Sequence, residues 1–185
     1  MVDKKTGIWD LATAKKKHSC DFLLAGIIGY YFKPLFAADL GCGPGHYCKI
    51  FKAFGWPNVH GYEGTPDIYQ CCNAYNDIME KDLTEELSLP YDYDFVLCLE
   101  VGEHIPKEFE QIFLDNVCSL TKKDLVLSWA VPGQGGTAHV NEQPNEYIIA
   151  QCEQRNLKLQ EKLTKRLRKY SSLKWFKNTL LVFNK

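Results

Sequence analysis

The sequence predicts an α/β fold built on a largely parallel sheet, and two observations support this prediction. Strand-like and helix-like segments alternate from residue 35 to residue 131 at the spacing of βαβ units. Two of the strand-like segments, residues 94–99 and 125–131, are strongly apolar without polar alternation, which is typical of parallel strands that helices cover on both faces. At 185 residues, the chain fits a single domain with a sizeable core.

The first elements are expected to be a helix, a strand and a second helix. Apolar residues recur at helical spacing over residues 10–31, which predicts a long N-terminal helix with Asp10 or Thr13 as its cap. An apolar stretch predicts a strand over residues 35–40. The helix that follows it is expected over residues 45–54.

The middle of the chain continues this alternation. A second short strand is expected over residues 59–63, and the proline of Thr65-Pro66-Asp67 suits the first turn of another helix. A short extended piece near residues 78–79 precedes the buried strand at 94–99. Residues 106–120 carry apolar side chains on one side, which predicts an amphipathic helix.

The last third is expected to complete the sheet. The buried strand at residues 125–131 leads into a glycine-rich loop at residues 132–136. A helix is expected over residues 144–156. Two further strands are expected around residues 158–162 and 180–183, and the second of them closes the sheet.

The composition is that of a soluble globular protein, with 45% hydrophobic and 24% charged residues. No apolar run approaches the roughly 20 residues that cross a bilayer, and no signal-peptide core follows the N-terminus. The sequence therefore predicts a cytoplasmic protein without a membrane segment. Its eight cysteines show no paired C-x-x-C spacing, so we expect reduced thiols and no metal site.

A glycine-rich segment follows the strand at residues 35–40. Residues 39–45 read Asp-Leu-Gly-Cys-Gly-Pro-Gly, with glycines at positions 41, 43 and 45. Glycines at this spacing let the backbone turn sharply and approach a ligand closely. The dinucleotide fingerprint G-x-G-x-x-G has glycine where this chain has His46. The segment therefore predicts a nucleotide-like cofactor and matches a nicotinamide or flavin site imperfectly.

Acidic residues follow the next strands at the same edge of the sheet. Glu63 ends the second strand, where a carboxylate can accept hydrogen bonds from both hydroxyls of a ribose. Asp82 follows the third strand and either accepts a hydrogen bond from an adenine amino group or caps a helix over residues 84–87. The fourth strand ends beside the same cleft with Glu100, Glu103 and His104.

Together these motifs resemble those of the class I S-adenosylmethionine-dependent methyltransferases. Residues 39–45 are similar to the first motif of that family, Glu63 matches its ribose-binding acid, and Asp82-Leu83 resembles its adenine-contacting pair. Residues 95–106 read Phe-Val-Leu-Cys-Leu-Glu-Val-Gly-Glu-His-Ile-Pro and are similar to its fourth-strand signature. The resemblance spans residues 35–131 and implies a Rossmann-like, doubly wound sheet, mostly parallel with an antiparallel C-terminal strand and helices on both faces.

The resemblance also implies S-adenosyl-L-methionine as the cofactor and assigns roles around it. The glycines would let the backbone approach the methionine portion and the sugar, with Asp39 ordering the loop. Glu63 would hold the ribose, and Glu100 with Val101 would pack along the cofactor. The expected cofactor-binding residues are Asp39, Gly41, Cys42, Gly43, Gly45, His46, Tyr47, Glu63, Gly64, Asp82, Leu83, Glu100 and Val101.

We expect one methyltransferase domain over residues 1–185. Within it, an N-terminal helical cover (residues 1–33) precedes the cofactor-binding core (residues 34–131) and an acceptor-side loop, helix and closing strands (residues 132–185). The acceptor is expected beyond the cofactor's methyl group, and Trp9 and Trp129 are candidate walls of its pocket.

Methyl transfer needs a base only when the acceptor loses a proton. His104 and His139 are the candidate catalytic residues, because imidazole titrates near neutral pH. We expect a small-molecule or sugar-like acceptor, methylated on oxygen or nitrogen. Two alternatives stay open: an RNA or DNA acceptor held by the basic segment 158–177, which has eight lysines and arginines and one acid, or a non-catalytic cofactor-binding partner subunit.

Overall fold

The computed structural model describes residues 2–3, 5–71 and 77–185. The strands in these ranges form a sheet in the order β3-β2-β1-β4-β5-β7-β6. Strands β1 to β5 pair in parallel, whereas β7 is antiparallel to both β5 and β6. The strands are β1 (Phe36–Leu40), β2 (Asn58–Glu63), β3 (Ile78–Glu80), β4 (Tyr93–Leu99), β5 (Thr121–Ser128), β6 (Lys158–Leu159) and β7 (Leu181–Asn184).

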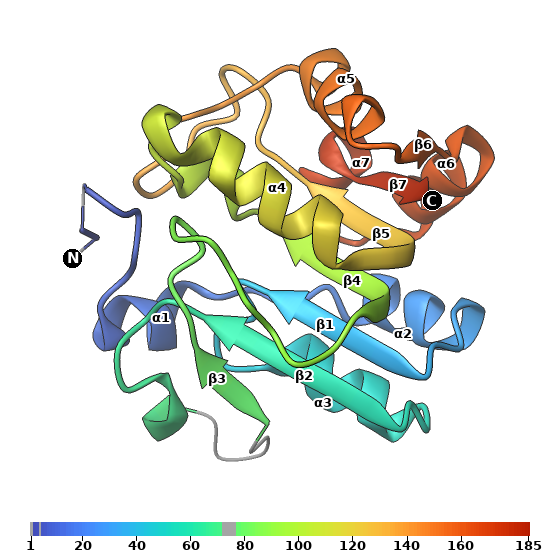
Figure 1. Ribbon diagram of the computed structural model, residues 1–185, viewed down its shortest axis with the longest axis horizontal. Helices are drawn as coiled ribbons and strands as arrows, with labels where there is room; N and C mark the ends of the chain where they lie inside the picture. The colour runs from blue at the N-terminus through green and yellow to red at the C-terminus, as the bar shows by residue number, and fades with distance from the viewer. Residues whose placement is uncertain (1, 4, 72–76) are drawn as a thin grey trace.

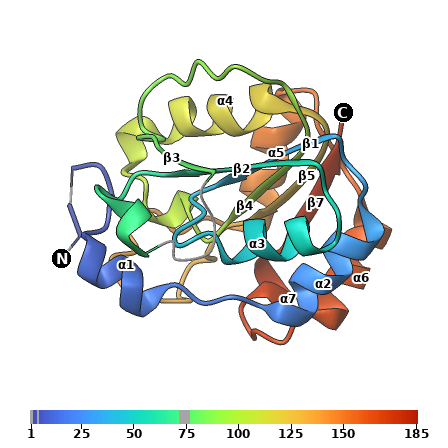
Figure 2. The ribbon, with the colours of Figure 1, turned by 90° about the horizontal axis from the view of Figure 1, so that it is seen from below.

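Helices cover both faces of this sheet (Figure 2). One face carries α4 (Glu110–Leu120) and α5 (Asn145–Gln154). The other face carries α2 (Phe22–Tyr31), α3 (His46–Ala53), α6 (Glu161–Tyr170) and α7 (Phe176–Thr179). Helix α1 (Leu11–Lys17) lies beyond the end of the sheet to which the arrowheads of β1 and β2 point (Figure 1). The predicted fold class is therefore confirmed.

The order of the strands reverses between β1 and β4. Strands β2 and β3 extend to one side of β1, and β5 follows β4 on the other side. Sheets of this kind bind ligands in the crevice beyond the carboxyl ends of the strands at such a reversal. The topology alone thus points to the ends of β1 and β4.

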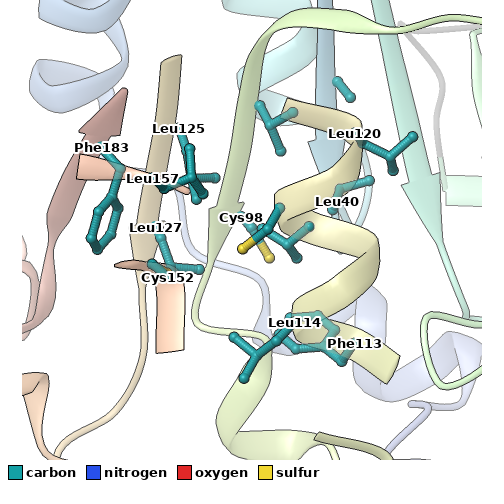
Figure 3. Close-up of a cluster of buried hydrophobic side chains, with 14 of the residues drawn as sticks. Leu40, Cys98, Phe113, Leu114, Leu120, Leu125, Leu127, Cys152, Leu157 and Phe183 are labelled. Carbon is teal, nitrogen blue, oxygen red and sulfur yellow. The ribbon is translucent and has the colours of Figure 1, made fainter. Parts of the chain in front are cut away.

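Two clusters of buried apolar side chains hold the helices to the sheet. In one cluster, Leu114 of α4 and Cys152 of α5 pack with Leu125 and Leu127 of β5 (Figure 3). The other cluster lies on the face of α2, α3, α6 and α7. Because helices cover both of its faces, β5 is buried from Leu125 to Ser128, which explains the unbroken apolar run in the sequence.

The N-terminal helix is interrupted, so the prediction of one helix over residues 10–31 is wrong. Two helices form because each has its own cap: Asp10 accepts a hydrogen bond from the N–H of Thr13, and Asp21 accepts one from the N–H of Leu24. The carboxylate of Asp21 is buried and also accepts hydrogen bonds from residues 171–173. The break therefore depends on a contact with a remote part of the chain.

The C-terminal third also differs from its prediction. The strand expected over residues 158–162 is reduced to β6, and the basic residues that follow form α6. Leu167 of α6 is fully buried against the sheet, while the lysines occupy its exposed side. Residues 161–170 carry apolar side chains at helical spacing, and this pattern indicates a helix where the sequence analysis expected the end of a strand.

Smaller corrections concern three other elements. The helix expected from Thr65 is a 3₁₀ turn at Ile68–Cys71, beyond which the chain leaves the described residues. The helix expected over residues 84–87 is absent from the structure, which has a turn there. Strand β5 begins at Thr121 rather than at residue 125, because Thr121 pairs with Tyr93 of β4.

The described cysteines are all free thiols, while Cys72 lies outside the described residues. In the same ranges of the chain, no helix combines the length and the apolar character that a membrane crossing requires.

Candidate active site

A cavity of about 400 Å³ opens at the carboxyl ends of β1, β2 and β4. This volume falls within the ~300–1,000 Å³ typical of small-molecule sites. The cavity lies where the strand order reverses, as expected for this topology. Its walls come from the glycine loop after β1, the residues that follow β2, β3 and β4, the loop after β5, the N-terminal residues, and Trp175 and Phe176 at the start of α7.

The structure brings most of the predicted cofactor residues to this cavity. Gly43 and Gly45 do not line it, although both have a positive φ, +52° and +78°. A Cβ atom at Gly43 would lie 2.3 Å from the ring of His18, so packing as well as backbone shape requires glycine there. The predicted residues that line the cavity are Asp39, Gly41, Cys42, His46, Tyr47, Glu63, Gly64, Asp82, Leu83, Glu100 and Val101.

The carboxylate of Glu63 anchors the glycine loop from the end of β2. Its Oε2 accepts a hydrogen bond of 2.8 Å from the backbone N–H of Gly43. Its Oε1 accepts hydrogen bonds from the N–H and the hydroxyl of Thr65, at 3.0 Å and 2.9 Å. An ionised carboxylate has about four acceptor sites, so these three bonds leave capacity for a hydroxyl of a ligand in the cavity.

Asp39 and Asp82 both accept hydrogen bonds from neighbouring side chains or backbone, and those of Asp82 agree with the capping alternative that the sequence left open. The Oδ2 of Asp39 accepts a hydrogen bond from the thiol of Cys48 at 3.5 Å, and burial raises the pKa of the Asp39 carboxyl to about 7. Asp82 accepts hydrogen bonds from the N–H and the hydroxyl of Thr84, at 2.8 Å and 2.7 Å. Asp82 thus caps a turn while it also lines the cavity, and its contact with an adenine stays a prediction.

Residues 6–19, called the N-terminal strap below, form one wall of the cavity. The ring of Trp9 lies between those of His18 and His104, with centroids 5.2 Å from each. A Cβ at Gly7 would lie 2.1 Å from the carbonyl oxygen of His104, so the strap packs closely on the residues after β4. The sequence singled out Trp9 as a wall, but no local signal marked His18.

The other candidate wall, Trp129, does not line the cavity. It is buried in the core under α4, and its indole N–H donates a hydrogen bond of 2.6 Å to the carbonyl oxygen of Asn141. Its ring also fills the space beside Gly102, where a Cβ would lie 2.2 Å from it. Trp129 therefore supports the loop after β5 from beneath.

The two predicted catalytic histidines lie together, with ring centroids 5.0 Å apart, and both line the cavity. The Nδ1 of His104 is 3.3 Å from the carbonyl oxygen of Ala138, and the Nδ1 of His139 is 2.9 Å from Oε1 of Glu142. Both partners are acceptors, so each Nδ1 carries a hydrogen, and in the neutral form of a ring its Nε2 is an acceptor. Burial, followed by the neighbouring His139, lowers the pKa of His104 to about 4.

Glu103 is the unexpected member of this group. Its side chain is fully buried, and neither carboxylate oxygen has a hydrogen-bond partner among the described residues. Oε1 lies 4.0 Å from Nε2 of His139. Burial, and then the nearby Glu100, raise the pKa of Glu103 well above its usual value. The sequence placed Glu103 beside the cleft without giving it a role.

A sequence profile described as a methyltransferase domain matches residues 38–162, which is more than half of the chain. The chain belongs to the methyltransferase family. This finding confirms the family that the motifs indicated, and it identifies the protein as an enzyme. No curated protein matches the methyltransferase by sequence.

Solved structures similar to this methyltransferase agree with its fold. Magnesium protoporphyrin IX methyltransferase from Synechocystis PCC 6803, with bound SAM, is 17% identical with a TM-score of 0.64, over 93% of this chain and 88% of that one. The sugar N-methyltransferase KedS8 from Streptoalloteichus sp ATCC 53650 is 12% identical with a TM-score of 0.66, over 95% and 88%. The methyltransferase domain of bacterial CtHen1 is 13% identical with a TM-score of 0.63, over 95% and 100%.

Proposed function

We propose that this methyltransferase transfers the methyl group of S-adenosyl-L-methionine to an oxygen or nitrogen of a small-molecule or sugar-like acceptor. One observation carries the proposal. A single cavity holds, over β1 to β3, the residues expected around the cofactor and, after β4 and β5, the two histidines expected at the acceptor. The cofactor agrees with the SAM and SAH bound in structures of similar fold.

The cofactor half of the cavity has the chemistry that a nucleoside needs. Glu63 is already fixed by Gly43 and Thr65, so it can accept ribose hydroxyls without first losing side-chain freedom. Gly41 has φ +74°, and a Cβ there would lie 2.4 Å from Val101, so glycine keeps the backbone close to the cavity wall. Leu83 offers an apolar surface beside Asp82, as an adenine requires.

The acceptor half begins beyond Val101, where His104 and His139 face the cavity. Methyl transfer from a sulfonium is an in-line displacement: the bond from sulfur to the methyl carbon breaks as a bond from the acceptor atom forms. The donor is already activated, so alignment and exclusion of water supply most of the rate enhancement, up to ~7–11 kcal/mol in favourable cases. The N-terminal strap, which walls the same cavity, is suited to exclude water.

The location of helix α6, which carries five of the eight basic residues of segment 158–177, favours a small acceptor over a nucleic acid. Half of this segment is α6, whose exposed side carries Lys162, Lys165, Arg166 and Lys169. The last part of the segment reaches the cavity with two apolar side chains, Trp175 and Phe176. Figures 1 and 2 both place α6 at the opposite end of the molecule from α1, whose last residue Lys17 borders the cavity. A strand of RNA bound on α6 would therefore lie away from the acceptor half. A cytoplasmic location stays a prediction, with which the free thiols agree.

A labelled-methyl assay tests the proposal. The protein is incubated with S-adenosyl-L-methionine carrying a labelled methyl group and with pooled metabolites, nucleoside sugars, protein or RNA as acceptors. We expect label in the small-molecule pools and none in RNA. Label in RNA that disappears steeply with added salt would support the nucleic-acid alternative instead, because phosphate contacts release counterions. Cofactor binding without transfer to any pool would favour the partner-subunit alternative.

A further inference from the structure

Three side chains converge beside the acceptor end of the cavity, which His104 and His139 line and behind which Glu103 is buried. One ligand atom each from Glu103, His104 and His139 lies within 4.8 Å of the others. Glu103 and His104 lie in the turn after β4, and His139 lies in the loop after β5. Two imidazoles and a carboxylate are a ligand set for first-row divalent cations.

The hydrogen bonds of the two rings fix which atoms point into this cluster. The Nδ1 of His104 bonds to the carbonyl oxygen of Ala138, and the Nδ1 of His139 bonds to the carboxylate of Glu142. Each ring therefore offers the lone pair of Nε2. A histidine whose Nδ1–H donates to a carboxylate or a carbonyl is the usual arrangement in metal sites, since the partner fixes the ring and raises its basicity.

The third group is a carboxylate that lacks a partner. Glu103 is fully buried and neither of its oxygens accepts a hydrogen bond from any residue that the structure describes. An unpaired ionised carboxylate away from water is strongly unfavourable, so a proton or a cation must compensate it. Its titratable neighbours are His139, whose Nε2 lies 4.0 Å away, and the second acid Glu100, so a cation held between the carboxylate and the two rings would compensate its charge.

A glycine keeps the space beside the cluster open. A Cβ at Gly136 would lie 2.1 Å from Nε2 of His139, which would fill the position in front of that lone pair. Gly136 and His139 both line the cavity, so the open space is continuous with the acceptor half.

We propose that Glu103, His104 and His139 bind a first-row divalent cation, such as Mn²⁺, and that the cation holds an acceptor hydroxyl for methylation. The substrate class follows: an acceptor that presents a hydroxyl, preferably two neighbouring hydroxyls, to the metal. The acceptor in this inference rests on the proposed function. The cation site rests only on the placement of Glu103, His104 and His139. It departs from the absence of a metal that the sequence led us to expect.

The cation supplies what the residues alone do not. Bound to the metal, the acceptor hydroxyl has a lowered pKa and loses its proton to water. The oxygen then forms its bond to the methyl carbon while the bond to sulfur breaks. The products are a methyl ether, neutral S-adenosylhomocysteine and one released proton. The two histidines act in this scheme as ligands, and Glu142 is a positioning residue for His139.

Binding of Mn²⁺ alone tests the metal site. The free protein is treated with a chelator, dialysed and titrated with Mn²⁺, and free Mn²⁺ is followed by electron paramagnetic resonance. Mn²⁺ is chosen because it favours nitrogen and oxygen ligands over the eight thiols, which would compete for Zn²⁺. We expect one equivalent to bind, and we expect Glu103→Gln and His139→Ala each to weaken binding at least tenfold.

Two variants serve as matched controls. Glu108→Gln changes an exposed acid of the neighbouring turn. His60→Ala changes a histidine of β2 that is hydrogen-bonded to Tyr93 of β4. Both should bind Mn²⁺ as the wild type does. Circular dichroism of every variant confirms folding, and because Glu103 is buried, the more accessible His139→Ala keeps the test valid if Glu103→Gln fails to fold. No stoichiometric Mn²⁺ binding by the wild type, or equal binding by folded Glu103→Gln or His139→Ala, would overturn the proposal and leave Glu103 a protonated acid.

Calorimetric titration of S-adenosyl-L-methionine into the same samples separates this proposal from the proposed function. Cofactor binding together with no Mn²⁺ binding refutes the metal site alone. Mn²⁺ binding that depends on Glu103, in a protein that binds no cofactor, supports the metal site and refutes the proposed function. With both ligands bound, we expect transfer to a hydroxyl acceptor to be lost on chelation and restored by Mn²⁺.

Discussion

The carboxylate of Glu63 accepts a hydrogen bond of 2.8 Å from the backbone N–H of Gly43. This bond joins the end of β2 to the glycine loop that follows β1, so two motifs that are separate in the sequence form one unit in the structure. The second oxygen of the same carboxylate is held by Thr65. Glu63 is therefore oriented before any ligand arrives, which reduces the entropy that binding would otherwise cost.

Replacing Glu63 should weaken binding of the cofactor. We expect Glu63→Ala to cost about 1.5–3 kcal/mol of binding free energy, because hydrogen bonds between a carboxylate and ribose hydroxyls are charge-assisted. Calorimetry with S-adenosyl-L-methionine measures the change. Thr65→Val is the matched control, since it removes one hydroxyl contact to Glu63 but leaves the carboxylate in place. A Glu63→Ala protein with wild-type affinity would show that Glu63 does not bind the ribose.

Glycine at position 43 is required by its surroundings, and a comparison of two glycines isolates that requirement. Gly43→Ala should lose most cofactor affinity, because its Cβ would displace the ring of His18, which lines the cavity. Gly55→Ala is the control: Gly55 also has a positive φ, +83°, but no atom lies within 4 Å of its Cβ position. Both variants should lose some stability, measured by thermal melting. Equal cofactor affinities for the two variants would contradict this explanation.

Asp39 should couple cofactor binding to a proton. Its carboxyl, which faces the thiol of Cys48 and the carboxylate of Glu63, has a pKa of about 7. The sulfonium and ammonium charges of the cofactor favour the ionised form, so binding near pH 6.5 should release part of a proton. Calorimetry in two buffers of different ionisation enthalpy measures the release. Asp39→Asn should remove this contribution, and an unchanged release would rule it out.

The same carboxyl should make folding less stable as the pH rises. Its folded pKa lies above that of an unfolded aspartate, so its contribution to stability is fully present below about pH 4 and is lost as the pH rises through 7. The loss is on the order of 4 kcal/mol at most. We therefore expect Asp39→Asn to unfold at higher denaturant concentration than the wild type at pH 8 and to lose this advantage at pH 4.

The N-terminal strap should slow the release of the cofactor. Trp9 contacts the rings of His18 and His104, and each such ring contact contributes about 0.5–1.5 kcal/mol. We expect Trp9→Ala to raise the dissociation rate of the cofactor several-fold, as measured by stopped-flow displacement. Phe22→Ala, which changes an exposed side chain of α2, is the control and should dissociate at the wild-type rate. A strap that plays no part in closure would give equal rates for all three proteins.

The sequence allowed the sheet and one half of the site to be predicted, because their signals are local. The positive φ angles of Gly41, Gly43 and Gly45 are a property of one loop, and Glu63 is the last residue of a short strand. Each of these features can be recognised from a few neighbouring residues.

The features that escaped prediction depend on contacts between distant segments. The break before α2 is held by Asp21, which binds residues 171–173, and His18, which lines the cavity, lies in that break. Glu103 has no local sign of its burial, since the loop that carries His139 reaches it only in the folded chain. The proposal that Glu103 binds a cation depends on its two carboxylate oxygens, which have no hydrogen-bond partner among the described residues.

A crystal structure with S-adenosylhomocysteine tests the central claim most directly. We predict that both ribose hydroxyls lie within about 2.6–3.2 Å of the Glu63 carboxylate, with the sulfur facing His104 and His139. Binding of this ligand outside the cavity, or inside it with the ribose turned away from Glu63, would contradict the account.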